Sequence, residues 1–136
     1  MMGKKSRTKG LDFERWVAKR MREKFPEAKR GLQSREGDEA PDVDGTPWFI
    51  ECKRYAKKVD LGAAMAQVLA AKDQRPAIVV WRVDHGKPQV SVPMDPTADM
   101  LLPISLDWYT AGSWQPFYGG YTFIVTVPFE DWFAQL

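Results

Sequence analysis

Three residues, Asp42, Glu51 and Lys53, have the types and the spacing that metal-assisted hydrolysis requires. Glu51 and Lys53 are separated by one residue in the apolar segment 49–53, so on a β-strand their side chains project to the same face. Asp42 follows a proline on the other arm of a predicted hairpin and can reach that face as well. Two carboxylates and an amine that converge suit a divalent metal ion and an attacking water. This combination indicates hydrolysis of phosphodiesters.

Hard oxygen ligands favour Mg²⁺, which keeps several waters and takes only a few protein carboxylates. We predict Asp42 and Glu51 as ligands, joined by the backbone carbonyl of Cys52, and we expect Mn²⁺ to substitute. Lys53 would hold or help activate the nucleophile, or stabilise the pentacovalent charge. A surface hairpin with an ordinary ion pair is the alternative, because Glu-x-Lys alone is a common pattern.

A helix predicted over residues 11–25 would supply a third carboxylate. Pro26 ends this helix. Its apolar residues recur every four positions and form one stripe: Phe13, Val17, Met21 and Phe25. Glu14 lies on the border of that stripe, where a carboxylate is costly without a partner. A metal ion or a lysine would supply the partner, so Glu14 is predicted to join the site directly or through water.

The remaining pattern predicts strands on both sides of a second helix. Asp44-Gly45 predicts a turn before the strand that carries Glu51. An Ala-rich helix follows, in which Gln67 is expected to point inward or toward the site. The helix lies between that strand and an apolar strand, an arrangement that predicts a crossover and a parallel strand pair. The predicted ranges are a first strand near 30–33, the helix 61–72, strands 77–82, 89–92 and 121–127, and a short helix or tail 129–136.

This order predicts one α/β domain over residues 1–136, with a central mixed β-sheet flanked by helices. Residues 1–10 are expected to form a basic mobile arm, and residues 95–120 an irregular, aromatic-rich insert. Cys52 alternates to the face opposite Glu51 and is expected to pack beneath the second helix. Among the tryptophans, Trp16, Trp48 and Trp81 are expected in the core. The others are open between core, dimer surface and base-stacking wedge: Trp108, Trp114 and Trp132.

The charge distribution points to a polyanionic partner. The net charge is only +2, but residues 1–58 hold 16 Lys and Arg against 10 Asp and Glu, whereas residues 59–136 hold 4 against 8. The basic half also carries the carboxylates, which attraction to a nucleic acid explains better than a solvated surface does. No apolar run approaches a membrane span. A single cysteine and the lack of a secretory signal favour a reducing compartment such as the cytoplasm.

Taken together, these motifs resemble the PD-(D/E)XK nuclease superfamily. Within it, the chain is similar to the archaeal-type and phage-encoded Holliday-junction resolvases over about residues 3–82, with a weaker match near the C-terminal strand. The resemblance is carried by Lys9-Gly10 through Phe13-Glu14-Arg15, Arg30-Gly31-Leu32-Gln33-Ser34-Arg35, Pro41-Asp42-Val43, Phe49-Ile50-Glu51-Cys52-Lys53, and Gln67.

The resemblance implies a restriction-endonuclease-like core and active-site roles for Glu14, Asp42, Glu51 and Lys53, with Gln67 supporting them. It further implies a homodimer that makes two symmetric cuts in branched, four-way DNA, in the cytoplasm of a prokaryotic or phage-infected cell. Ser34 matches a loop serine of resolvases. Further basic and polar residues flank the site and are expected to contact DNA phosphates: Lys9, Arg30, Gln33, Arg35, Arg54 and Lys57.

Other functions fit the same residues. A nicking, repair or restriction-type nuclease would share the fold, although the chain lacks a separate recognition domain for sequence-specific restriction. A catalytically inactive module that only binds DNA is a second possibility. A metabolic or structural α/β protein with a basic face is a third.

Overall fold

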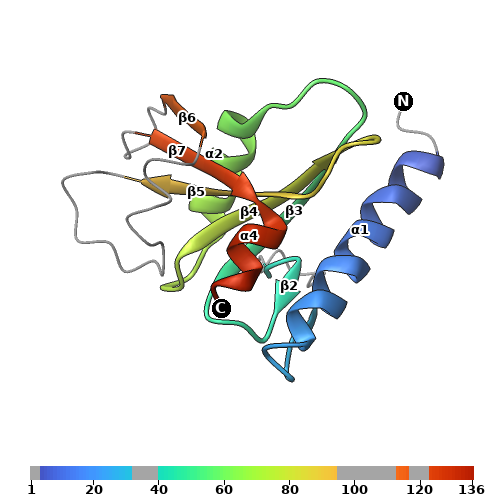
Figure 1. Ribbon diagram of the computed structural model, residues 1–136, viewed down its shortest axis with the longest axis vertical. Coiled ribbons are helices and arrows are strands. Elements are labelled where there is room, and N and C mark those ends of the chain that lie inside the picture. Colours follow the sequence, from blue (N-terminus) through green and yellow to red (C-terminus); the bar gives the residue numbers. More distant parts are fainter. Residues whose placement is uncertain (1–3, 32–39, 95–112, 117–122) are drawn as a thin grey trace.

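The computed structural model describes residues 4–31, 40–94, 113–116 and 123–136. These residues form a seven-stranded mixed β-sheet, ordered β1-β2-β3-β4-β5-β7-β6, with helices on both faces (Figure 1). The predicted α/β class and flanked mixed sheet are confirmed. The elements are α1 (Lys4–Arg22), β1 (Lys29–Arg30), β2 (Val43–Asp44), β3 (Phe49–Tyr55), α2 (Leu61–Ala71), β4 (Ala77–Val83), β5 (Gln89–Met94), β6 (Ser113–Pro116), β7 (Phe123–Pro128) and α4 (Phe129–Ala134).

The centre of the sheet is the parallel pair β3–β4, in which Glu51 lies opposite Val79 and Lys53 opposite Trp81. Helix α2 makes the crossover between these strands, as the order of elements predicted. All other neighbouring strands pair antiparallel. Residues 77–80 of β4 are buried, which explains their unbroken apolar run: both faces of this strand are covered.

Two apolar layers enclose the sheet. On one face, α1 and α4 pack together over Ile50 and Cys52. On the other, α2 packs over Phe49 and Val79. Cys52 does lie opposite Glu51, but the expectation that it packs beneath α2 is wrong. The strand alternation was correct; the sequence did not say which helix covers which face.

Aromatic rings tie α4 to the hairpin that precedes β3. Trp48 and Trp132 are both buried, with ring centroids 5.2 Å apart. Trp132 is therefore a core residue, which resolves one of the alternatives for the tryptophans. Trp48 is buried as predicted, and Trp16 and Trp81 are partly buried against the same two layers. The prediction for Trp108 lies outside the described residues.

The boundaries of α1 differ from the prediction at both ends. The helix begins at Lys4 rather than at residue 11, so residues 4–10 are not an arm. No proline interrupts this stretch, and Lys9 is anchored by an ion pair with Asp84 at 3.0 Å. The helix ends at Arg22, although the Phe25 amide still donates to the Met21 carbonyl at 2.8 Å. The first strand is short, 29–30, and the irregular insert contains β6.

No helix within the described ranges is long and apolar enough to cross a membrane.

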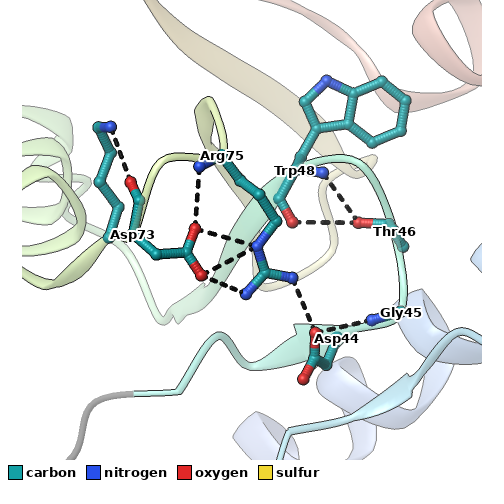
Figure 2. Close-up of polar contacts among 7 residues, drawn as sticks. Asp44, Gly45, Thr46, Trp48, Asp73 and Arg75 are labelled. Carbon is teal, nitrogen blue, oxygen red and sulfur yellow. Dashed lines mark hydrogen bonds and ion pairs between the residues drawn. The ribbon is translucent and has the colours of Figure 1, made fainter.

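A charged clamp fixes the turn between β2 and β3 against the loop that leads into β4 (Figure 2). The Arg75 guanidinium donates to Asp44 at 2.8 Å and to Asp73 at 2.7 Å. The bond to Arg75 lowers the pKa of Asp44. Gly45 follows with φ +80°, and a Cβ there would lie 2.1 Å from the Glu27 carbonyl oxygen, so only glycine fits. The clamp sets the position of the hairpin that carries Asp42.

Candidate active site

The candidate site lies where β2 separates from β3. Asp42 immediately precedes β2, and its amide donates to the Ile50 carbonyl at 2.8 Å. Its side chain also bonds to β3: Asp42 Oδ2 accepts a hydrogen bond from the Cys52 amide at 2.8 Å. The carboxylate therefore completes the hydrogen bonding between β2 and β3 at the point where these strands diverge. It satisfies the Cys52 N–H, which the backbone of β2 no longer reaches.

The segment before Asp42 is held from the other side by Gly31. The Gly31 amide donates to the Asp42 carbonyl at 2.9 Å. A Cβ at Gly31 would lie 1.7 Å from the Pro41 carbonyl oxygen, so any side chain there would push the chain away. Both flanks of Asp42 are thus fixed by backbone contacts.

The carboxyls of Asp42 and Glu51 are neighbours in the site, and each affects the ionisation of the other. Burial and the neighbouring Glu51 charge raise the pKa of Asp42 to about 6, against the opposing bond from the Cys52 amide. Burial also raises the pKa of Glu51, although Lys53 acts in the other direction. Two neighbouring like charges that are half-buried are unfavourable unless a proton or a cation lies between them.

Lys53 supplies the nearest cation and is itself oriented by α2. Its Nζ lies 3.5 Å from Glu51 Oε1 and donates to Gln67 Oε1 at 2.8 Å. Gln67 thus reaches the predicted site from the helix, although its side chain is largely exposed. The amide oxygen holds the ammonium beside the carboxyl pair without neutralising it.

Glu14 faces the site from α1, but a base already binds it. Arg30 donates to Glu14 Oε2 through Nε at 3.3 Å and Nη2 at 3.2 Å. Burial, and next the charge of Asp42, raise the pKa of Glu14, while Arg30 lowers it. Glu14 therefore acts on the carboxyl pair through its charge, and Arg30 is an ion-pair partner here rather than a free DNA contact.

The negative charge of Asp42 and Glu51 suits a cation, but these side chains alone do not supply a complete set of metal ligands. Among the residues with a described structure, no three Asp, Glu, His or Cys side chains lie close enough to hold a metal ion by themselves. The predicted three-carboxylate ligand set of Glu14, Asp42 and Glu51 is therefore not assembled. The close pair, Asp42 and Glu51, would need a backbone carbonyl and waters to complete a coordination shell, which is the way Mg²⁺ is commonly bound.

The Cys52 thiol is not a candidate nucleophile. Complete burial raises the pKa of this thiol well above its ordinary value, and the surrounding carboxylates add to the effect. A thiol that does not ionise is inert.

The residues predicted to contact DNA have different outcomes. Lys57 is exposed in the segment after β3. Lys9 and Arg54 both bind Asp84, and Arg30 binds Glu14. Gln33, Ser34 and Arg35 lie outside the described residues.

Sequence reasoning missed two arginines. Arg75, which holds the hairpin, has one partner 31 residues away in the chain, and no local pattern indicates such a pair. Arg82 ends the apolar run of β4 and has a buried Nε with no hydrogen-bond partner. A charged residue that directly extends a buried strand was the available signal.

Comparison of the chain with protein-family models, curated proteins and solved structures gives no match. The chemistry must therefore be inferred from the site itself.

Proposed function

We propose that the protein is a metal-dependent DNA endonuclease that hydrolyses phosphodiester bonds. The observation that carries the proposal is the half-buried pair Asp42–Glu51 beside a lysine that Gln67 orients. Two neighbouring carboxyls with raised pKa values need a cation, and the basic half of the chain that contains them favours a polyanionic substrate. A protease or glycosidase dyad would not need the lysine or the surrounding positive charge.

Mg²⁺, with Mn²⁺ as a substitute, is the proposed cofactor. Asp42 and Glu51 would bind it, and the Cys52 carbonyl is a further candidate. The N–H and C=O of a strand residue point to the same side, and the Cys52 N–H points to Asp42. When bound, the ion supplies charge neutralisation and lowers the pKa of water.

The protein's own residues would do the rest. Lys53 lies where it can donate to a non-bridging phosphate oxygen or hold the attacking water, and Gln67 keeps its ammonium in place. Glu14 adds negative charge that strengthens cation binding. The hairpin clamp and Gly31 keep Asp42 in register with Glu51, so that the reacting groups need not be reorganised.

The finer form of the proposal is a homodimeric Holliday-junction resolvase on a restriction-endonuclease-like core, acting in the cytoplasm. The antiparallel hairpin, the α2 crossover and the parallel β3–β4 pair support such a core. The step to a resolvase rests on the sequence resemblance. Two symmetric cuts need two sites related by a two-fold axis, which a homodimer provides.

The test is cleavage of a synthetic four-way junction in Mg²⁺, Mn²⁺ or EDTA. Asp42→Asn and Glu51→Gln are expected to abolish cleavage but keep DNA binding, because each removes charge with little change of shape. In Asp42→Asn, the side-chain amide oxygen can still accept the bond from the Cys52 amide. Asp131→Asn, the same change at an exposed position of α4, is expected to cut like the wild type.

Each alternative has its own result. If both site variants still cut in Mg²⁺, the assignment of the site is wrong. Equal cleavage of flaps or linear duplex would leave a nuclease but not a resolvase. DNA binding without cleavage, together with calorimetry that detects no divalent-ion binding, would show a DNA-binding module instead.

A further inference from the structure

A second group of basic side chains lies on the α1 face of the sheet, at the carboxyl ends of β3 and β4. Arg54 and Arg82 are direct partners in the parallel register. Each follows by two positions a core residue of that face, Cys52 or Val80, so both project toward α1. Like charges on neighbouring strands repel, and this arrangement is favourable only if an anion lies beside it.

Among the described residues, one acid, Asp84, forms ion pairs with this group. Asp84 Oδ1 accepts from Arg54 Nε at 2.9 Å, and Asp84 Oδ2 accepts from Lys9 Nζ at 3.0 Å. Arg82 has no such partner: its Nε is buried and makes no hydrogen bond, and within the described part of the chain no carboxylate pairs with it. Two of the three cations thus share one carboxylate, and the third, the half-buried guanidinium of Arg82, has no counter-charge, which is costly.

The helix above this group leaves room for a ligand. The contact from Lys9 to Asp84 places the N-terminal half of α1 beside the turn between β4 and β5 (Figure 1). Gly10 precedes Val17 by seven residues and so belongs to the stripe that faces the sheet. A Cβ at Gly10 would nevertheless meet no atom within 4 Å. A glycine on an inward stripe beside open space suits the close approach of another molecule.

We propose that Lys9, Arg54 and Arg82 bind a backbone phosphate of the DNA. This inference rests on the proposed function and adds a binding site apart from the reacting groups. A guanidinium fork matches two phosphate oxygens, and the buried Arg82 Nε gains the acceptor that it lacks. Arg54 follows Glu51 by three residues, about 10 Å along the strand but on the opposite face of the sheet, so a DNA molecule that contacts both must pass the carboxyl ends of β3 and β4. Such a contact fixes the register of the DNA on the protein.

The test measures binding of the full chain to a fluorescent four-way junction in EDTA, where cleavage does not interfere, over a range of salt concentrations. Arg82→Gln is expected to weaken binding about 10-fold at low salt and to reduce the slope of log K against log salt by about one. Lys19→Gln is the matched control. It removes one exposed charge from α1, the helix that also carries Lys9. Lys19 lies ten residues, or about 15 Å, from Lys9.

Loss of folding cannot mimic this result. Among the described residues Arg82 has no polar partner to lose, and its unpaired charge is costly, so Arg82→Gln is expected to melt at the temperature of the wild type or above it. Gly10→Leu is the second variant: it changes no charge, places a side chain in the open space, and is also expected to weaken binding about 10-fold.

Wild-type affinity and salt slope in both variants would overturn the phosphate site, while junction cleavage by the wild type would still support the proposed function. Failure of the proposed function itself gives a different result. If the wild type neither binds nor cuts DNA, the proposed function fails. If inorganic phosphate then raises the melting temperature of the wild type but not of Arg82→Gln, the group binds free phosphate and its assignment to DNA is wrong.

Discussion

A half-buried carboxyl beside a second carboxyl is favourable in the folded chain only while a proton or a cation accompanies it. Asp42 has an ordinary pKa of 3.8, which the fold raises to about 6. Between these values the folded chain binds more protons than the unfolded chain, so the free energy of unfolding falls as the pH rises. The contribution of Asp42 to stability is therefore present at low pH and is lost as the pH rises through about 6.

This residue-scale effect predicts that Glu51→Gln stabilises the metal-free protein at pH 7.5, by about 1–2 kcal/mol, while it abolishes cleavage. The neutral amide removes the repulsion that raises the pKa of Asp42. Urea unfolding in EDTA at pH 4.5 and 7.5 measures the difference in free energy of unfolding between the variant and the wild type. The effects of the other titrating groups are the same in both proteins and cancel in this difference. The difference should shrink at the lower pH.

Addition of Mg²⁺ provides the control for this prediction. A cation that binds only the folded wild type raises its free energy of unfolding at pH 7.5, and the variant should gain much less. A variant less stable than the wild type at pH 7.5 without metal would contradict the assignment of strain to the carboxyl pair.

At the scale of elements, the hairpin that carries Asp42 is held by Arg75. Arg75→Gln removes the bonds to Asp44 and Asp73 and should destabilise the fold by about 1–2 kcal/mol, because charge-assisted bonds of a mostly buried guanidinium are lost. It should also lower the cleavage rate at saturating DNA without changing DNA affinity, since the hairpin sets the position of Asp42. Chemical denaturation and single-turnover cleavage test both effects.

The control is Arg15→Gln, which removes an exposed ion pair with Asp12 within α1. Such a pair contributes little, so stability should stay within about 0.5 kcal/mol of the wild type. If Arg75→Gln behaved like Arg15→Gln in both measurements, the clamp would have no role in positioning the site.

At the scale of the whole molecule, α4 completes the core that supports the hairpin. Trp132 is 1% exposed and contacts both Trp48 and Phe129. Trp132→Ala should therefore cost about 3–5 kcal/mol, because it leaves a large cavity between α1, α4 and the sheet. Urea unfolding followed by circular dichroism measures this loss.

Trp132→Phe keeps most of the volume and should cost clearly less than Trp132→Ala. Equal stability of the alanine variant and the wild type would mean that α4 does not close this core.

The sequence predicted the local geometry around Glu51 and Lys53 better than the contacts between distant elements. Strand alternation alone placed Glu51 and Lys53 on one face, and the chain order alone predicted the parallel β3–β4 pair, because both follow from short-range geometry. The bond between Arg30 and Glu14 was not predictable, since a loop arginine can serve a carboxylate of the protein or a phosphate of a ligand equally well.

Contacts between distant elements were likewise missing from the prediction. The first turns of α1 contact Asp84 through Lys9, and these two residues are 75 positions apart in the chain. Which helix covers Cys52 depends on how the chain wraps around the sheet. Such choices are decided by tertiary packing rather than by local pattern.

The hydrogen bond from the Cys52 amide to Asp42 makes this backbone amide sensitive to the charge on the Asp42 carboxyl. The nitrogen-15 resonance of this amide responds to the ionisation of Asp42 and to any cation that draws charge from the carboxylate. A single peak in a two-dimensional spectrum would thus report the ionisation of Asp42, and it would also report a cation if one binds at the junction of β2 and β3. The chain carries its own spectroscopic probe at that position, with no label attached to the reacting groups.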